Sequence, residues 1–345
     1  MATSNSVAGR PVRVETIDYH TGGEPFRIVT AGVPDLEGRT ILERRQWAAA
    51  NLDDVRHLLV DEPRGHADMY GAFVCPPNDE GADLGVVFFH NEGYSTACGH
   101  GTIALVTWAL ETGRLRATEP EVRVTVDVPS GRLACRARLR AGKVESVAFR
   151  NVPSWVLATG VRLQASRGTI ELDVGFGGAF YGAVEAADLD LDISAQSLPR
   201  LIELQRELRP ALDAALDIVH PDEPELHGTY GIIFWSAEPA EPDVALVQRN
   251  VTVFADGEVD RSPCGSGTSA RLAMLDASGE LARGSTLRHR SIVHSTFLGR
   301  VVAAGPPIGG RPSVITEVEG SAFPTGHHAF VLDPGDPLGT GFLLR

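Results

Sequence analysis

The sequence is poor in cysteine and in positive charge. Four cysteines in 345 residues, with no C-x-x-C pair among them, form neither a disulfide framework nor a close metal-binding pair. We therefore expect a reduced compartment, in which each thiol either fills a core or takes part in chemistry. The 45 acidic side chains outnumber the 31 basic ones, and the formal net charge is −14. Because phosphate neutralisation dominates affinity for nucleic acids and anionic membranes, neither is an expected partner.

Long apolar runs are absent as well. A membrane-spanning helix needs about 18 or more apolar residues in succession, and no such run occurs. Residues 1–9 are small and polar and lack the basic and then apolar pattern of a secretory signal. These absences predict a cytoplasmic protein without a membrane partner. A chain of 345 residues also exceeds the about 100 to 200 residues of a typical domain, so two domains are expected.

One segment of the sequence occurs twice. Residues 98–115 read CGHGTIALVTWALETGRL, and residues 264–281 read CGSGTSARLAMLDASGEL. Both copies open on Cys-Gly-x-Gly-Thr, continue for the length of a helix and reach a glycine, Gly113 or Gly279. Glycine is the usual residue just past a helix end, so each copy predicts a helix that carries a cysteine at its N-terminal end. The first copy is apolar almost all round, which is typical of a buried helix.

The repeat predicts two α/β domains related by duplication. Each would hold one central helix, with Cys98 at the start of the first and Cys264 at the start of the second. Apolar or β-branched runs bounded by turn or polar residues flank both copies and indicate strands. These runs are 84–89, 122–126, 231–235 and 244–247.

A cysteine at the start of a helix lies where a thiolate forms readily. The first turn has unsatisfied N–H groups and the positive end of the helix dipole, which favour the ionised thiol. The glycines that follow Cys98 and Cys264 leave the backbone bare, so a small anion can approach these N–H groups. Inverting a stereocentre without a cofactor needs one group to remove the α-proton and a second group to return a proton on the opposite face. Two facing cysteines suit that exchange, and no metal, pyridoxal phosphate or nucleotide is required.

Four segments of the sequence carry a wider pattern: DYHTGGEPFRIV (18–29), HNEGYSTACGHGTIAL (90–105), FGGAFYG (176–182) and DRSPCGSGTSARLA (260–273). In this order they resemble the motifs of the proline racemase family, which includes proline racemase, 4-hydroxyproline 2-epimerase and trans-3-hydroxyproline dehydratase. The resemblance implies the fold of diaminopimelate epimerase. That fold has two pseudo-symmetric α/β domains, each a β-sheet wrapped round a central helix, with the active site in the cleft between them.

In this fold the C-terminal strand returns to the first domain. The resemblance therefore implies a first domain of residues 1–155 plus 331–345, which carries Cys98. The second domain would be residues 156–330, which carries Cys264. The fold is usually a monomer or a homodimer, and one of these assemblies is expected.

The resemblance also implies roles for individual residues. Cys98 and Cys264 would be the acid and base pair, and the substrate would be a small imino acid. His100 and Asp260 would lie beside its ring nitrogen, and Phe254 would form an apolar wall. Backbone N–H groups would hold the substrate carboxylate. The residues that supply them would be Gly99, His100, Gly265 and Ser266.

Two reactions of the family remain candidates. Cysteine at both positions favours 4-hydroxyproline 2-epimerase, because inversion needs proton transfer on both faces. The loop HNEGYST (90–96), however, resembles the dehydratase branch, and Ala97 stands where many relatives have methionine, leaving room for a ring hydroxyl. Trans-3-hydroxy-L-proline dehydratase, which forms pyrroline-2-carboxylate, is therefore the alternative. Proline racemase is a further alternative.

Other classes of function explain less of the sequence. A hydrolase with a cysteine nucleophile and a histidine base would use Cys98 and leave Cys264 without a role. A two-lobed amino-acid receptor would normally be exported. Diaminopimelate epimerase itself usually has asparagine where this chain has His100. A zinc site built on Cys98 and His100 lacks a second pair of ligands nearby.

The remaining cysteines and several histidines have structural explanations. Cys75 and Cys135 have no counterpart in the repeat and are expected to fill the core. His20 is expected to form a hydrogen bond across a turn. His220, followed by proline, is expected to cap a helix that ends near Ile218.

Overall fold

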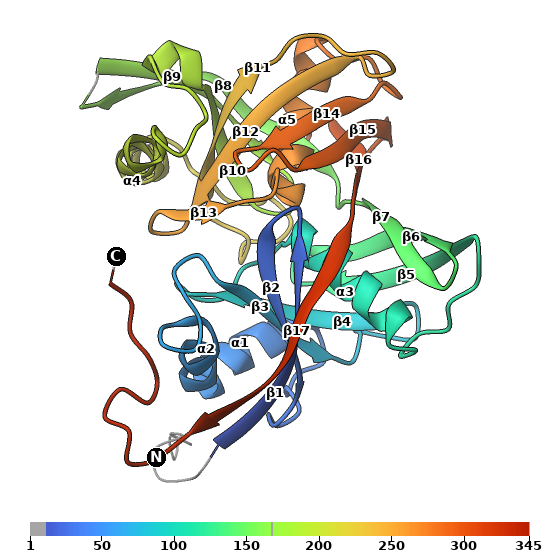
Figure 1. Ribbon diagram of the computed structural model, residues 1–345. Helices are drawn as coiled ribbons and strands as arrows, with labels where there is room; N and C mark the ends of the chain where they lie inside the picture. Colours follow the sequence, from blue (N-terminus) through green and yellow to red (C-terminus); the bar gives the residue numbers. More distant parts are fainter. Residues whose placement is uncertain (1–11, 167, 345) are drawn as a thin grey trace.

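The computed structural model describes residues 12–166 and 168–344, and over this range the chain forms two halves (Figure 1). The first half takes the N-terminal part of the chain together with the last strand. Its elements are β1 (Val12–Thr21), β2 (Glu24–Ala31), α1 (Ile41–Asn51), α2 (Asp53–Val60), β3 (Tyr70–Cys75), β4 (Leu84–His90), α3 (Gly99–Glu111), β5 (Glu121–Val128), β6 (Gly131–Arg140), β7 (Lys143–Arg150) and β17 (Ala322–Leu332). Those of the second half are β8 (Ser154–Ala165), β9 (Gly168–Phe176), β10 (Phe180–Glu185), η1 (Ala186–Leu189), α4 (Leu198–Ala215), β11 (Thr229–Ala237), β12 (Leu246–Phe254), β13 (Glu258–Asp260), α5 (Gly265–Ser278), β14 (Leu287–Ser291), β15 (Thr296–Ala304) and β16 (Ser313–Gly320).

In each half the strands pair into a closed ring. The first ring runs β17, β1, β2, β3, β4, β5, β6, β7, and β7 pairs with β16, which leads directly into β17. The second ring runs β8, β9, β10, β11, β12, β14, β15, β16, and β16 pairs back with β8. Helix α3 contacts strands on several sides of the first ring, and α5 does the same in the second. Each ring is therefore wrapped round one helix.

The two rings repeat one pattern of strand directions. Starting from β1 in the first half or β9 in the second, successive pairs are antiparallel, parallel, antiparallel, parallel, antiparallel and antiparallel. A parallel pair needs a crossover connection, and helices supply it. Helix α3 connects β4 to β5, and α5 makes the equivalent connection from β12 to β14. The duplication seen in the two cysteine segments thus extends through both halves.

The central helices are buried on all sides because strands surround them. In α3 every residue from Gly99 to Leu110 is buried, and in α5 every residue from Gly265 to Leu275. This environment explains why the first copy of the repeat has no polar face. The predicted glycine stops are confirmed, since Gly113 and Gly279 follow the two helices with φ of +73° and +76°.

Three of the four predicted strands are confirmed. Residues 84–89 lie within β4, residues 122–126 within β5 and residues 231–235 within β11. The prediction of a strand at 244–247 is wrong at its start, because β12 begins at Leu246. Asp243 has a φ of +67°, and this turn keeps the next two residues out of the strand.

The last strand returns to the first half earlier than residue 331. Strand β17 pairs with β1 from Ala322 onward, where Ala322 lies opposite Thr21. Strand β8, from Ser154 onward, pairs with β9 and β16 of the second half. We therefore propose domain limits near residues 153 and 321 in place of 155 and 330.

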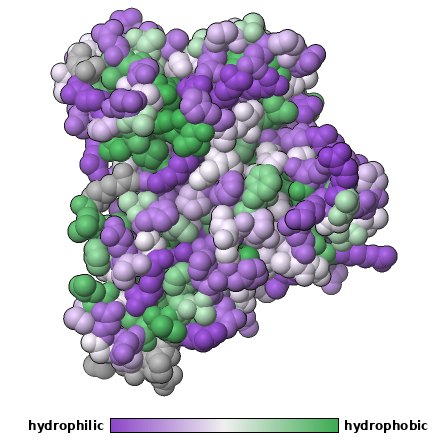
Figure 2. Space-filling model, viewed as in Figure 1, coloured by the Kyte–Doolittle hydropathy of each residue, from purple (hydrophilic) through white to green (hydrophobic). Residues whose placement is uncertain are grey.

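Hydrophilic side chains cover most of the face shown in Figure 2, and hydrophobic ones gather in its upper part, beside the junction of the two halves. Among the described residues, no helix is both long enough and apolar enough to span a membrane.

Candidate active site

The two central helices meet at their first residues. A Cβ added to Gly99 would come within 2.5 Å of the Cα of Gly265, and a Cβ on Gly265 within 2.6 Å of the Cα of Gly99. The ring of Phe149 lies 2.9 Å and 3.0 Å from the same two added atoms. Only glycine at both positions therefore lets the positive ends of two helix dipoles converge. The N–H groups of both first turns, which have no partner within their own helix, gather at this junction.

Cys98 is the N-cap residue of α3, and its thiol accepts the capping hydrogen bond. The backbone is extended, with φ −150° and ψ 96°, and Sγ accepts from the N–H of Gly101 at 3.2 Å. A Cβ on Gly101 would come within 2.6 Å of that sulfur, so the glycine is needed for the thiol to occupy this position. Nε2 of His100 lies 3.4 Å from the same sulfur. The sulfur thus lies among the unsatisfied donors of the first turn.

Cys264 has the equivalent place in α5 but a different backbone. Its φ is +61° and its ψ is 108°, a combination that residues with a side chain rarely adopt. Backbone strain of this kind costs about 1 to 3 kcal/mol and persists where the surrounding structure imposes it. Sγ lies 3.9 Å from the hydroxyl of Tyr181 and 4.0 Å from Oγ of Ser266. A Cβ on Gly267 would come within 2.9 Å of this sulfur, which repeats the arrangement at Cys98.

Burial opposes ionisation of both thiols. Cys98 and Cys264 are only 5% and 6% exposed. Burial raises the pKa of Cys98 well above its ordinary value, although the hydrogen bond from Gly101 acts to lower it. Burial also raises the pKa of Cys264 to about 12, and the charge of Asp260 contributes to that increase. A thiolate at either position therefore needs a cation beside it.

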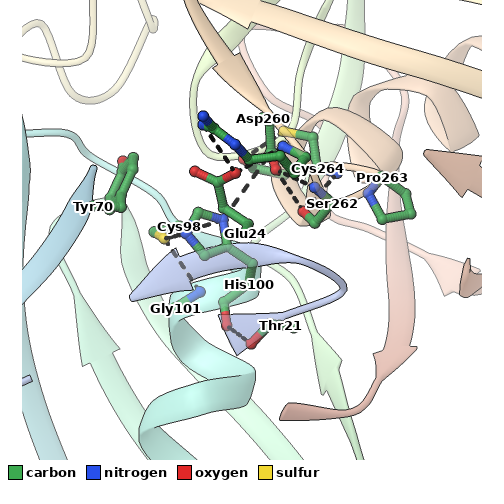
Figure 3. A network of polar contacts seen from close by, with 12 residues as sticks. Thr21, Glu24, Tyr70, Cys98, His100, Gly101, Asp260, Ser262, Pro263 and Cys264 are labelled. Atoms are coloured by element: carbon green, nitrogen blue, oxygen red, sulfur yellow. Dashed lines mark hydrogen bonds and ion pairs between the residues drawn. The ribbon is translucent and has the colours of Figure 1, made fainter. Parts of the chain in front are cut away.

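His100 and Asp260 come from opposite halves and face each other near the cysteines (Figure 3). Nδ1 of His100 lies 3.8 Å from Oδ2 of Asp260. Burial lowers the pKa of His100 to about 3, so its imidazole is neutral. Burial raises the pKa of Asp260 to about 6, although Oδ1 accepts hydrogen bonds from the N–H and the hydroxyl of Ser262. At neutral pH this pair thus offers one negative charge and a neutral ring.

The structure brings every site residue predicted from the sequence to this junction. These residues are Cys98, Gly99, His100, Asp260, Cys264, Gly265 and Ser266. Phe254, predicted as an apolar wall, is buried nearby and stacks on Tyr230 with 5.3 Å between ring centroids. The geometry does not test the roles of these residues, which stay predictions.

Three further residues of the junction were not predicted. Glu24 is fully buried and accepts a hydrogen bond from the N–H of Arg261 at 2.7 Å. Tyr70 donates to Oγ of Ser95, and its ring lies 4.9 Å from that of His100. Tyr181 shares a 2.7 Å hydrogen bond with Ser266. Glu24 and Tyr181 lie within segments 18–29 and 176–182, so the motif pattern pointed to their neighbourhood, whereas nothing marked Tyr70.

The structural explanations given for other residues hold with one exception. Cys75 and Cys135 are buried within hydrophobic clusters, as predicted. Nδ1 of His20 accepts a hydrogen bond from the N–H of Gly23 across a turn, which confirms that prediction. The prediction for His220 is wrong: α4 ends at Ala215, and His220 instead accepts from two N–H groups of the following turn. No group of three or more His, Cys, Asp or Glu side chains within 12–166 and 168–344 is arranged to hold a metal ion.

Two pseudo-symmetric rings, each wrapped round a helix that starts at a cysteine, define an enzyme of the diaminopimelate epimerase fold, in the class of racemases, epimerases and related lyases. Within that class the chain belongs to the proline racemase family, which it matches over residues 16–343. The family and the fold class expected from the four sequence segments are thereby confirmed.

Individual relatives differ in the reaction for which they are named. The chain is 46% identical over 333 residues to a 3-hydroxyproline 2-epimerase of Burkholderia multivorans, covering 96% of this chain and 98% of that protein. It is 43% identical over 329 residues to a trans-3-hydroxy-L-proline dehydratase of Bacillus cereus, covering 95% and 97%. A solved structure of a hydroxyproline epimerase from Agrobacterium vitis, with bound trans-4-hydroxy-L-proline, has a TM-score of 0.89 at 32% identity and covers 96% of each chain.

Proposed function

We propose that this protein inverts the α-carbon of hydroxyproline by proton transfer between two cysteines. The observation that carries the proposal is the equivalence of Cys98 and Cys264. Each lies at the start of a buried central helix, and the helices meet at Gly99 and Gly265. Inversion suits such a pair, because acid and base exchange roles each time the substrate inverts.

The substrate carboxylate binds at the meeting point of α3 and α5. An anion is stabilised there by first-turn N–H groups and by two helix dipoles. As the α-proton leaves, negative charge builds up on Cα and spreads onto the carboxylate, and the converging donors stabilise it. The proposed donors are the N–H groups of Gly99, His100, Gly265 and Ser266.

Proton transfer then needs one thiolate and one thiol. The thiolate takes the α-proton from one face, and the thiol gives its proton to Cα from the other face. Because burial raises the pKa of both thiols, the base forms beside a cation. The ring ammonium of the substrate, held by Asp260 and next to neutral His100, supplies that cation.

We propose a substrate with its hydroxyl on C3. The relatives that are 46% and 43% identical are named for 3-hydroxyproline, whereas the epimerase with bound trans-4-hydroxy-L-proline is 32% identical. This differs from the 4-hydroxyproline that the sequence favoured. The two cysteines constrain the reaction at Cα and carry no information about the position of the ring hydroxyl.

Dehydration of trans-3-hydroxy-L-proline is the second candidate, and a cluster of hydroxyl groups favours it. The hydroxyl of Tyr70 bonds to that of Ser95 and lies 3.0 Å from that of Tyr230. In this reaction the thiolate takes the proton from Cα, the C3–O bond breaks, and the hydroxyl leaves as water with a proton from a nearby donor. The enamine that forms then tautomerises to Δ1-pyrroline-2-carboxylate.

Proton NMR in deuterated water distinguishes these reactions. Trans-3-hydroxy-L-proline, trans-4-hydroxy-L-proline and L-proline are incubated separately with the protein. We expect deuterium at Cα of the 3-hydroxy compound together with its C2 epimer. Loss of that compound to a pyrroline carboxylate establishes the dehydratase instead. Epimerisation of the 4-hydroxy compound alone, or of L-proline alone, contradicts the proposed substrate, and no reaction with any of the three contradicts the proposed chemistry.

A further inference from the structure

Glu24 has a carboxyl oxygen that folding alone does not explain. The residue opens β2, directly after the Gly22–Gly23 turn, and its side chain is fully buried. Oε2 accepts the N–H of Arg261 at 2.7 Å, whereas Oε1 has no hydrogen-bond partner among the described residues. Burying an unpartnered carboxyl oxygen is costly, so such an atom calls for an explanation. A glutamine would accept the same N–H without a charge.

Acidic side chains outnumber basic ones around Glu24. Three buried acidic side chains, those of Glu24, Asp68 and Asp260, gather round the single guanidinium of Arg261. That guanidinium donates to Asp68 at 2.8 Å and lies 3.8 Å from Oε2 of Glu24. Burial, and then the charge of Asp260, raises the pKa of Glu24 well above its ordinary value. A bound cation would relieve this excess of negative charge.

The position of Glu24 indicates which cation that is. Figure 3 shows its carboxyl group between Cys98 of the first half and Asp260 of the second, within the network that holds both cysteines. This is the space in which the proposed function puts the substrate ring. The ammonium of an imino-acid ring has two N–H donors, and one acceptor leaves the other donor buried and unsatisfied.

We propose that Oε1 of Glu24 accepts one N–H of the substrate's ring ammonium while Asp260 accepts the other. Glu24 is then a substrate-binding residue that favours a ring nitrogen with two N–H donors over one with a single N–H or a ring without nitrogen. The inference rests on the proposed function, because it assumes an imino acid between the two cysteines. It adds a contact from the first half to the one that Asp260 makes from the second.

Binding measurements on Glu24→Gln test the contact, with Asp68→Asn as the matched control. Both substitutions remove one negative charge beside Arg261, but only the first puts an amide toward the substrate. Both are made in the Cys264→Ser protein, so that ligands bind without inversion. Calorimetry compares trans-3-hydroxy-L-proline with cyclopentanecarboxylate, a ring acid of the same size without nitrogen. Cyclopentanecarboxylate binding also reports that the site is folded.

We expect Glu24→Gln to weaken the affinity for the imino acid about 10- to 100-fold, as for a lost hydrogen bond to a charged group. The affinity for cyclopentanecarboxylate should change less than about threefold. Asp68→Asn should keep the ratio of the two affinities within about threefold. Equal weakening of both ligands by Glu24→Gln, or no weakening of either, overturns the inference. The inference is also overturned if Glu24→Gln weakens the binding of trans-3-hydroxy-L-proline but not that of L-proline, because Oε1 would then contact the ring hydroxyl.

A second test compares ligands on the protein with its natural Glu24, so it does not depend on the folding of a carboxylate variant. N-methyl-L-proline keeps the ammonium charge but has one N–H, so it should bind about 10-fold or more weakly than L-proline. Equal affinities overturn the inference. Wild-type protein that neither binds nor converts any imino acid overturns the proposed function as well. Conversion by the wild type, with an unchanged affinity ratio in Glu24→Gln, overturns the role of Glu24 alone.

Discussion

The halves that carry Cys98 and Cys264 share a strand order and a central helix, yet they present different side chains to the junction. Two residues after the cysteine, α3 has the neutral imidazole of His100, and α5 has Ser266. The backbone of Cys98 is extended at φ −150°, whereas that of Cys264 has φ +61°. Both halves have kept a thiol and bare N–H groups. In the proposed mechanism these are the groups that proton transfer requires on each face of the stereocentre. What diverged fits the proposed substrate, a ring that has its nitrogen on one side.

The halves also differ in where their negative charge comes from. Asp260 lies four residues before Cys264, and the matching position before Cys98 is Tyr94. The first half contributes its buried carboxyl group from β2 instead, as Glu24. The charge at the junction thus arises from residues outside the repeated helix segment. The comparison predicts equal effects for equivalent changes in the two repeated segments.

The largest effects are expected from the cysteines themselves. Cys98→Ser and Cys264→Ser should each lower the rate of epimerisation about 10²- to 10⁴-fold, because a hydroxyl gives up and accepts a proton far less readily than a thiol does at this position. The double variant should be little worse than either single one, since in the proposed mechanism the two thiols act as a unit. Rates of epimer formation by polarimetry or NMR check this. A large loss in one single variant only would break the equivalence and favour dehydration.

Large effects, again similar in both halves, are expected when the close contact between the two helix ends is disturbed. Gly99→Ala and Gly265→Ala should each reduce the free energy of unfolding by about 1 to 3 kcal/mol, because the new methyl group overlaps backbone of the other helix. Denaturant unfolding measures this. Gly335→Ala is the control, since its methyl group would meet one carboxyl oxygen at 3.3 Å and should change stability by less than about 0.5 kcal/mol. Wild-type stability in either helix variant would contradict the close contact.

A pH effect on stability is expected from Asp260, a buried carboxyl group of the second half. Its pKa is raised from 3.8 to about 6 in the folded protein, so the folded state keeps this proton to higher pH than the unfolded state does. Its contribution to stability is therefore full below pH 3.8 and is lost as pH rises through about 6. Relative to Asp260→Asn, wild-type unfolding free energy should fall by on the order of 2 kcal/mol over this window. Parallel curves from denaturant titrations at several pH values would contradict this.

Smaller effects are expected from the two tyrosines, one in each half. Tyr181→Phe removes the hydroxyl that lies 3.9 Å from the sulfur of Cys264, and Tyr70→Phe removes the one bonded to Ser95. Each lost hydrogen bond should slow epimerisation about 3- to 10-fold. If the protein dehydrates its substrate, Tyr70→Phe should slow water loss more than deuterium exchange at Cα. Equal slowing of both steps would leave Tyr70 without a role as proton donor.

Features that are local and repeated could be predicted from the sequence. In each copy the cysteine, the glycines beside its sulfur and the glycine after the helix all lie within one short segment, 98–115 or 264–281. The fold class followed from the motif segments around them. Contacts between residues distant in sequence could not be predicted in this way. Glu24 meets Arg261 across 237 positions, and Tyr70 meets Tyr230 across 160. Neither contact leaves a pattern in its own segment, and no periodicity reports a buried oxygen without a partner.

The most direct test of two-sided proton transfer is deuterium exchange at Cα without inversion, measured by NMR for each single cysteine variant with each C2 epimer of 3-hydroxyproline. A remaining thiolate can still remove the α-proton from its own face and return a deuteron there. We predict that Cys98→Ser exchanges one epimer and Cys264→Ser the other, each leaving the configuration unchanged. Exchange of the same epimer by both variants would contradict the account, because in one of them that face of Cα would exchange its proton without the thiol assigned to it.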